Sequence, residues 1–485
     1  MEELINYLNE MNNKTIMLYL LMWEMDIIVP KDSFDKYIEI SSKLETEIFE
    51  MSTSSKYIDL LDNAINSDDF KKLDEYKQIY YLDLKKNYEK DKKIPKEFYE
   101  KFSREKSKSK QIWVEAKEKN DYKIFKPYLE KNIEMTKELY NYINPDTDNL
   151  YDDMLSEYEK DLKSKDIDIL FDELKKEIIP IVKNLKEKEL GLVEKDYSES
   201  ELIEISRFLL DYIGFDNNKG ALGIFPHGYT ITISNNDVRI AFNKTKNIFE
   251  HASTIIHEGG HGIFEQYAGN EFSELNLIGI NTIALHESQS RFYENILGRN
   301  INFWIPIYDK FKEISKIDLP LDIFVQYLNN AKASLVRTES DELTYCLHII
   351  IRYEIEREIF NNNIDLNLLP EIWNKKYKEY LGIDVISDRE GILQDMHWSD
   401  ASFGYFPSYL LGSIFDGMLL ENINNKLGNV DILLKEGRIK EITKYLNENI
   451  HKYAGSYNIF EVCKRICNKD MSVEPLVNYF KKKYE

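Results

Sequence analysis

Apolar residues recur every three or four positions along most of the chain, with Lys and Glu between them. This spacing places the apolar side chains on one face of a helix and leaves the charged ones in solvent. The stretch from Ile167 to Leu190 follows this pattern, although Pro180 lies inside it. Because proline lacks the N–H that an interior helical position needs, we expect a kink or a break there. The pattern predicts a mostly helical protein.

One segment has a different periodicity. From Tyr229 to Ile233, and again from Val238 to Phe242, β-branched residues alternate with others. Ser, Asn and Asp at positions 234–237 separate the two runs and are typical of a turn. We therefore expect a β-hairpin. Since a hairpin alone is marginally stable, it should form a small sheet packed beside the helical segment that follows it.

Nothing in the sequence marks a domain boundary. No stretch rich in Pro, Gly or Ser divides the chain, and only 11 prolines interrupt its 485 residues. No repeat of fixed period and no low-complexity tract is present. Apolar residues make up 43% of the chain, which is enough for a sizeable core. We expect a single domain over residues 1–485.

Charge and hydropathy exclude two classes of partner. The formal net charge is −22, whereas proteins that bind nucleic acids carry a basic surface. The excess of acidic residues is explained by solubility. The longest apolar run near the start, from Ile16 to Trp23, is too short to cross a bilayer. We predict neither a nucleic-acid partner nor a membrane partner.

The N-terminus and the cysteines favour a cytoplasmic location. Glu2 and Glu3 open the chain, where a signal peptide would carry basic residues. Cys346, Cys463 and Cys467 are an odd and sparse set, typical of a reducing compartment. The last two can share a helix face, but no further ligand type lies beside them. No metal site is predicted there.

The motif His257-Glu-Gly-Gly-His261 carries the strongest chemical signal. Residues four apart share a helix face, so both imidazoles can bind one metal ion. Glu258 then lies where its carboxylate can take a proton from water beside the ion. The alternative is a helix with two ordinary histidines. Two mid-helix glycines argue against that alternative, because each costs about 1 kcal/mol relative to alanine and needs a compensating close approach.

A catalytic zinc needs a third protein ligand and an open fourth position. The apolar stretch from Ile278 to Leu297 predicts a second helix, packed antiparallel to the first. Glu287 on this helix would complete a set of two histidines and one glutamate. The neighbouring His286 is a rival ligand, and the residues alone do not decide between the two.

Five segments together resemble the carboxypeptidase Taq family of zinc metallocarboxypeptidases. They occupy the C-terminal half in the family's order: Asp237-Val-Arg239-Ile, His257-Glu-Gly-Gly-His261, His286-Glu-Ser-Gln-Ser290, Arg337-Thr-Glu-Ser-Asp341-Glu-Leu-Thr-Tyr345, and Gly391-Ile-Leu-Gln394-Asp395-Met-His397-Trp398, continuing to Tyr409. The resemblance implies a large helical fold with a deep active-site cleft and a homodimer. It implies release of C-terminal residues one at a time with broad specificity, and Glu287 as the third zinc ligand.

Four residues, at three places in the chain, depart from the family's usual pattern. Ala241 stands where the family has Thr, Gly228-Tyr229 where it has Pro-Phe, and Ser340 where it has Ala. None of them is a predicted ligand or the predicted base. They bear on the shape of the substrate channel and on side-chain preference.

Peptide hydrolysis passes through an oxyanion, which needs hydrogen-bond donors, and a leaving amine, which needs an acid. His397, Tyr405 and Tyr409 are the candidate donors, and the sequence does not say which tyrosine faces the oxyanion. With 33 tyrosines in the chain, a packing role is the alternative for each. We expect Trp398 to lie in the core.

A carboxypeptidase must recognise a free carboxylate, which a planar guanidinium binds with both oxygens. Arg337 and Arg239 are the candidates, and the alternative for each is an ion pair; acidic neighbours favour an internal one for Arg337. His227 is a further substrate-binding candidate or a residue that caps the hairpin. Asp341 and Asp395 would either hold ligand histidines or cap helices, and the sequence does not separate these roles.

The resulting hypothesis is a metallocarboxypeptidase with one zinc per chain, in which cobalt can substitute because sites of this kind select metals weakly. Its substrates would be peptides with a free C-terminus. One alternative is a zinc endo-oligopeptidase on the same scaffold, without an arginine that binds the terminal carboxylate. A non-catalytic metal-binding protein is the other, although such a protein would not need Glu258.

Overall fold

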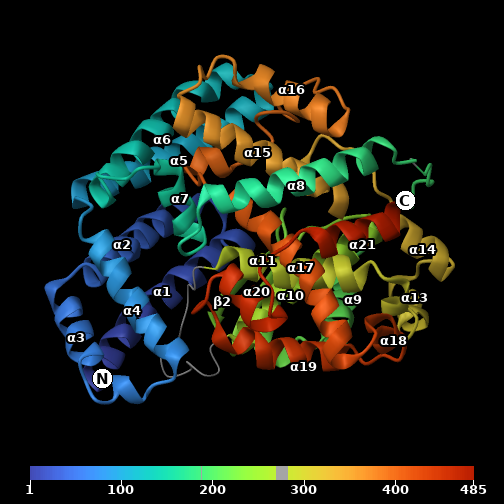
Figure 1. The fold of residues 1–485 in the computed structure, drawn as a ribbon, viewed down its shortest axis with the longest axis horizontal. Coiled ribbons are helices and arrows are strands. Elements are labelled where there is room, and N and C mark those ends of the chain that lie inside the picture. Colours follow the sequence, from blue (N-terminus) through green and yellow to red (C-terminus); the bar gives the residue numbers. More distant parts are fainter. Residues whose placement is uncertain (187, 269–281) are drawn as a thin grey trace.

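The computed structural model describes residues 1–186, 188–268 and 282–485. The predicted mostly helical fold is confirmed, and Figure 1 shows helices throughout the chain. The helices before the sheet are α1 Glu2–Ile27, α2 Phe34–Ser52, α3 Ser55–Ile65, α4 Glu75–Asp91, α5 Lys96–Lys119, α6 Tyr122–Ile143, α7 Leu150–Tyr158, α8 Ser164–Lys183 and α9 Glu199–Ile213.

After the sheet the chain is again helical. The helices are α10 Ile248–Tyr267, α11 Ile283–Arg291, α12 Ile301–Trp304, α13 Tyr308–Ser315, α14 Leu321–Leu328, α15 Glu342–Asn362, α16 Leu369–Leu381, α17 Phe406–Leu427, α18 Val430–Lys435, α19 Ile439–Asn449, α20 Ile459–Cys467 and α21 Glu474–Tyr484. A π-helix, Phe292–Gly298, follows α11 directly, and short 3-10 turns include Arg337–Glu339 and His397–Asp400.

The predicted hairpin is present with one strand more than expected. Strands β2 (Tyr229–Ser234) and β3 (Asp237–Phe242) pair antiparallel across a two-residue turn. Strand β1 (Gly220–Ile224) adds to the other edge of β3 in parallel, giving the order β1-β3-β2. Because β2 and β3 both pack on α10, the sheet lies beside the motif helix, as the sequence predicts.

Two predicted helices differ in their limits. Helix α8 buries the predicted stripe, including Leu170, Leu174 and Ile178, but it ends at Lys183 and not at Leu190. Pro180 lies in its last turn, so the helix continues for less than one turn beyond it. The second predicted helix is present from Ile283 onwards, and its predicted start at positions 278–281 lies outside the described residues.

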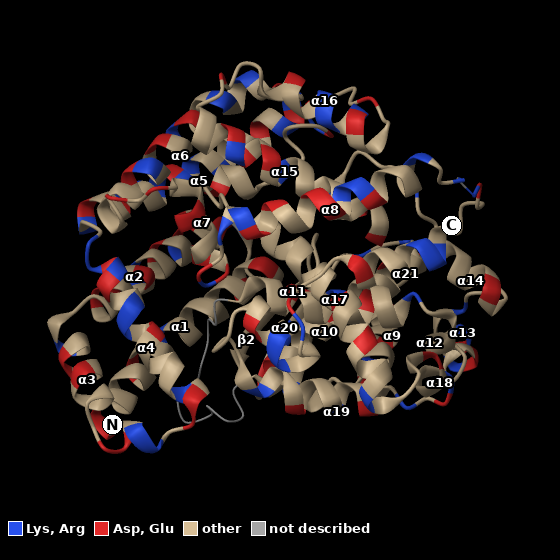
Figure 2. Ribbon diagram, viewed as in Figure 1, with Lys and Arg blue, Asp and Glu red and all other residues tan. Residues whose placement is uncertain are grey.

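The core surrounds the sheet and the two motif helices. One continuous cluster of buried apolar residues runs from Leu4 near the start to Phe480 near the end. In Figure 1, α10, α11 and β2 lie in the middle of the view, with helices α1–α4 to the left, α9 and α21 to the right and α19 below. Figure 2 shows basic and acidic residues interspersed along the helices. Within the described chain, no helix is long and apolar enough to cross a membrane.

Candidate active site

The motif helix α10 is positioned by its cap and by its glycines. The Asn247 side chain accepts hydrogen bonds from the first free backbone N–H groups of the helix. Gly260 lies so close to α11 that an added Cβ would be 2.7 Å from the Gln289 carbonyl oxygen. Gly259 meets the ends of two side chains of α9. Close helix packing thus explains why glycine occupies positions where it costs helix stability.

Helices α10 and α11 run antiparallel. Gly260 contacts Ser290, whereas Ile256, one turn earlier on α10, contacts Gly298 beyond the end of α11. This arrangement brings Glu287 opposite the histidine face of α10.

Three ligand atoms converge between the two helices. One atom each from His257, His261 and Glu287 lies within 4.8 Å of the other two. The Glu287 Oε2 atom is 4.0 Å from His257 Nε2 and 3.5 Å from His261 Nε2. The His257 and His261 side chains are 20% and 14% exposed, so the group is reachable from solvent. Two imidazole nitrogens and a carboxylate oxygen fit a divalent transition-metal ion by donor type.

Each histidine uses its second ring nitrogen to contact a residue behind it. His257 Nδ1 lies 2.9 Å from Glu294 Oε2, and Arg299 pairs with the other oxygen of Glu294. A carboxylate on Nδ1 leaves Nε2 free for a metal and fixes the ring. Burial raises the pKa of Glu294, but the hydrogen bond with His257 and the positive charges of His257, Arg299 and Arg291 together lower that pKa to about 2. Sequence reasoning missed Glu294, although it follows Glu287 by two helical turns.

His286, the rival ligand, lies behind His261 and outside the group of three. Its Nδ1 atom contacts His261 Nδ1, and its Nε2 atom is 2.6 Å from Glu265 Oε1. Both ring nitrogens of His286 are therefore engaged away from Glu287. These side-chain contacts, from Glu265 to His286 and from His286 to His261, orient the His261 ring.

A buried cation contacts the third ligand residue. Arg291, one turn after Glu287 on α11, donates from Nε to Glu287 Oε1 at 2.6 Å. Its guanidinium also stacks 3.6 Å from the ring centre of Tyr345. This leaves Glu287 Oε2 facing the histidines. Sequence reasoning missed Arg291 too, although its spacing of four residues from Glu287 on one helix is a signal for this contact.

The hairpin supports Glu258. Thr230 on β2 donates from its hydroxyl to Glu258 Oε2 at 2.8 Å. Gly228 lies against the same side chain, because an added Cβ would be 3.2 Å from Glu258 Oε1. Burial raises the pKa of Glu258 above its usual value. The carboxylate is thus held beside the histidines in an environment that strengthens it as a base.

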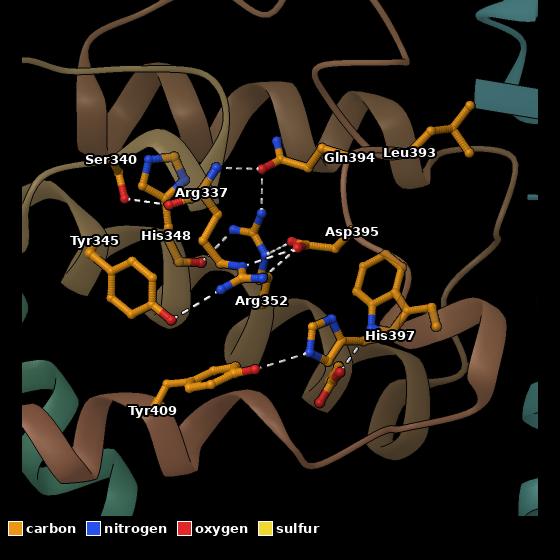
Figure 3. Close-up of polar contacts among 12 residues, drawn as sticks. Arg337, Ser340, Tyr345, His348, Arg352, Leu393, Gln394, Asp395, His397 and Tyr409 are labelled. Carbon is orange, nitrogen blue, oxygen red and sulfur yellow. Dashed lines mark hydrogen bonds and ion pairs between the residues drawn. The ribbon is translucent and has the colours of Figure 1, made fainter. Parts of the chain in front are cut away.

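Arg337 and Asp395 form the centre of a buried charged network (Figure 3). Arg337 donates to Asp395 Oδ1 from Nε at 3.0 Å and from Nη2 at 2.8 Å, and to the Tyr345 hydroxyl at 3.0 Å. Arg352 donates to Asp395 Oδ2 at 2.5 Å. The internal partner of Arg337 is therefore Asp395, and no ligand histidine contacts Asp395. Asp341 caps α15 by accepting from two backbone N–H groups.

His397, Tyr405 and Tyr409 lie together at the start of α17. His397 Nε2 is 3.4 Å from the Tyr409 hydroxyl, and the His397 Nδ1 atom has no hydrogen-bond partner among the described residues. The rings of Tyr405 and Tyr409 are 5.1 Å apart. Burial and then the charge of Glu287 raise the pKa of Tyr405 to about 12. Trp398 is buried, at 5% exposure.

The remaining predicted residues lie on the sheet. Arg239 on β3 pairs with Asp237 through two hydrogen bonds of 2.9 and 2.8 Å. His227 is exposed between β1 and β2. In the part of the chain that the structure describes, neither forms a hydrogen bond or an ion pair with the three ligand residues. Tyr229, one of the positions that depart from the family pattern, donates from its hydroxyl to Asp26 on α1 at 3.0 Å.

Comparison with known proteins agrees with this geometry. The family model described as carboxypeptidase Taq (M32) metallopeptidase matches residues 3–484. The chain is 36% identical to Carboxypeptidase 1 of Bacillus subtilis, covering 100% of this chain and 97% of that protein. It is 29% identical to Thermostable carboxypeptidase 1 of Pyrococcus furiosus, covering 96% and 94%.

Solved structures give the same result. A structure titled as a Pyrococcus furiosus carboxypeptidase in an apo-Mg form has a TM-score of 0.93 at 27% identity, covering 100% of this chain and 98% of that one. Trypanosoma cruzi metallocarboxypeptidase 1 has a TM-score of 0.91 at 26% identity, covering 100% and 99%. The chain therefore belongs to the carboxypeptidase Taq (M32) metallopeptidase family and is a metallocarboxypeptidase.

Proposed function

We propose that the metal is zinc, one ion per chain, held by His257, His261 and Glu287. The donor set supports this proposal, because two imidazoles and a carboxylate are a known catalytic zinc set. When bound, the ion supplies Lewis-acid polarisation of a peptide carbonyl and of water. Cobalt is expected to support activity as well, since nitrogen and oxygen sites select metals weakly.

Glu258 is proposed as the general base. Its carboxylate takes a proton from the attacking water and later gives it to the leaving amine. The hydrogen bond from Thr230 to Oε2 supports this role by fixing the carboxylate, and burial supports it by raising the pKa. His397, Tyr405 and Tyr409 are proposed as donors to the oxyanion. Burial, then the charge of Arg337, lowers the pKa of His397 to about 3, so this imidazole is neutral near pH 7.

The observation that best supports the carboxypeptidase chemistry of this site is a surplus of buried positive charge. Arg337 and Arg352 share a single carboxylate, that of Asp395. Among the described residues no other carboxylate forms an ion pair with either arginine, so Arg337 and Arg352 have only one ion-pair partner between them. A guanidinium has five N–H donors, and Arg337 uses three in the contacts described above. We therefore propose that Arg337 binds the substrate's terminal carboxylate with its remaining donors.

Arg239 and His227 are proposed as further substrate contacts beside the hairpin. Arg239 differs from Arg337 in its charge balance, since Asp237 matches it one to one. Its proposed contribution is therefore smaller than that of Arg337. Two of the positions that depart from the family pattern, Gly228 and Tyr229, lie at the start of β2, which pairs with the strand that carries Arg239, so this chain's side-chain preference is expected to be determined there.

The proposal is tested by measuring kcat/KM for a peptide with a free C-terminal carboxylate and for the same peptide amidated at its C-terminus. Losing a charge-assisted contact and leaving a buried arginine unpaired costs roughly 2–5 kcal/mol. Amidation should lower kcat/KM about tens- to thousands-fold. Arg337→Ala should remove most of that difference, whereas Arg239→Ala should keep most of it. Mass spectrometry should show single residues released in order from the C-terminus. Internal fragments appearing first, or equal cleavage of the amide, would favour the endo-oligopeptidase alternative.

Three finer properties complete the proposal. The resemblance to the family supports broad side-chain tolerance and a homodimer, and the sparse free cysteines support a cytoplasmic location. Light scattering of the purified protein tests the dimer, since a monomer mass at micromolar concentration contradicts it. Kinetics on peptides that differ only in the last residue test the tolerance, and fractionation of cells tests the location.

A further inference from the structure

A buried carboxylate on α15 has no part in the chemistry proposed above. Glu356 is fully buried, and among the described residues no Lys or Arg forms an ion pair with it. A carboxylate taken out of water needs compensation. Three neutral donors supply it, namely Trp398 Nε1 at 2.8 Å to Oε1, and the Tyr151 hydroxyl at 2.8 Å and Gly404 N at 2.9 Å to Oε2.

Two of these donors lie at the two ends of one segment. Trp398 directly follows His397, and Gly404 directly precedes Tyr405. The carboxylate of Glu356 thus fixes residues 397–405 at both ends. These are the residues that place the imidazole of His397 and the ring of Tyr405 beside each other, with ring centres 5.3 Å apart.

The third donor ties the segment to α7. Tyr151 lies on α7, and the backbone of Gly404 packs against the same helix, where an added Cβ would be 3.0 Å from the Met154 carbonyl carbon. Gly404 also has a φ of +85°, in the left-handed region that favours glycine. Glu356 therefore joins three parts of the fold, α15, α7 and the 397–405 segment, at one point.

One turn earlier on the same helix, Arg352 supports the other side of the site. It donates to Asp395 and to Gln394 Oε1, and Asp395 in turn binds Arg337 (Figure 3). Helix α15 thus carries two buried charged residues four positions apart. Arg352 acts on the residue proposed to bind the terminal carboxylate, and Glu356 acts on the residues proposed to bind the oxyanion.

We propose that Glu356 is a positioning residue for peptide hydrolysis, which holds His397 and Tyr405 in place without touching the substrate. The proposal rests on the oxyanion role given to those two residues under the proposed function. It differs from a purely structural role in its kinetic signature. Displacing oxyanion donors weakens binding of the transition state and leaves ground-state binding of the peptide nearly unchanged.

Glu356→Gln tests this inference, because glutamine has the same size but can accept at only one of the two positions where glutamate accepts. The N–H groups of the glutamine amide then face an N–H donor, that of Trp398 or of Gly404. Because two donors cannot hydrogen-bond to each other, the 397–405 segment must shift. A displacement of about 1 Å costs roughly a hundredfold in rate. We expect kcat to fall about 10- to 100-fold, KM to stay within about threefold and the metal content to be unchanged.

Glu354→Gln is the matched control. Glu354 lies on the same helix and accepts from Lys175, Lys376 and Tyr380, none of which forms a hydrogen bond or an ion pair with the 397–405 segment. This variant loses two ion pairs, so its thermal stability should fall while kcat stays within about twofold of the parent. Equal loss of kcat in the two variants, or a loss in Glu356→Gln that follows its metal content, would overturn the proposal.

Trp398→Phe gives a second measurement if Glu356→Gln does not fold. It removes the Nε1 donor together with part of the buried ring, so kcat should fall about fivefold or more with metal retained, and no change in kcat would overturn the proposal. When both variants fold, their effects should be less than additive, because they break the same contact. The proposed function is tested separately. A fully active Glu258→Gln would refute the role of Glu258 as the base, and the comparison of kcat between Glu356→Gln and Glu354→Gln would still decide the role of Glu356.

Discussion

Replacing Asp395 by Asn should destabilise the protein strongly, because one carboxylate serves two buried guanidiniums. Arg352 is fully buried, and the Arg337 and Asp395 side chains are 9% and 12% exposed. Breaking a buried ion pair by removing one partner costs about 3–5 kcal/mol. Asn keeps one acceptor oxygen but no charge, so we expect a loss of about 3–5 kcal/mol in the free energy of unfolding.

The loss should depend on pH in a defined direction. Burial alone would raise the pKa of Asp395, but the guanidiniums of Arg337 and Arg352 hold it well below its usual range. A carboxylate with a lowered pKa in the folded state stabilises the fold above its unfolded pKa of about 3.9, and this contribution is lost as the pH falls below that value. The difference between the parent and Asp395→Asn should be constant from pH 5 to 8 and should shrink below about pH 4.

Urea unfolding followed by circular dichroism measures both effects, with Asp237→Asn as a control. The Asp237 and Arg239 side chains are 35% and 18% exposed, and such a pair contributes about 0–1 kcal/mol. A loss for Asp395→Asn below about 1 kcal/mol, or equal to that of the control, would refute the argument from shared buried charge.

Three further predictions concern the metal site and the core. Glu294→Gln should weaken metal affinity about 10- to 100-fold in a chelator competition, because it removes the carboxylate behind His257; unchanged affinity would contradict that role. Gly260→Ala should lower the metal content and the thermal midpoint more than Gly259→Ala. The Cβ added at 260 meets the backbone of α11, whereas the Cβ added at 259 meets flexible side-chain ends. The reverse order would contradict the close approach of α10 to α11 at Gly260. Burial raises the pKa of Glu159 to about 8. The free energy of unfolding should therefore fall by about 1.4 kcal/mol for each unit of rising pH between roughly pH 4.5 and 8, and Glu159→Gln should remove that dependence in unfolding curves.

The sequence predicts those parts of the site that depend on local spacing. His257 and His261 share a helix face because they are four residues apart, and the β2–β3 hairpin follows from alternation. Strand β1 was not predicted, because Gly-Ala-Leu-Gly-Ile has neither alternation nor many β-branched residues. Its strand conformation comes from pairing with β3, a contact that the local pattern does not encode.

The residues behind the ligands were harder to predict, since they depend on packing. Glu294 lies seven positions after Glu287, but the π-helix Phe292–Gly298 changes the helical register and no residue pattern marks it. The partners of Asp395 are 58 and 43 residues away, so its role could not be separated from helix capping. Glu356 carries no signal in the sequence, because its donors come from other elements of the fold.

The central claim is that Glu258 is the base and that His257, His261 and Glu287 hold the metal. Metal analysis with turnover on a free-acid peptide tests it directly in two variants. Glu258→Gln should retain about one zinc per chain and lose most of its turnover, because the amide does not accept the proton of water. His261→Ala should lose both metal and activity. Full zinc occupancy in His261→Ala, or equal metal loss in the two variants, would contradict the assignment of ligand and base.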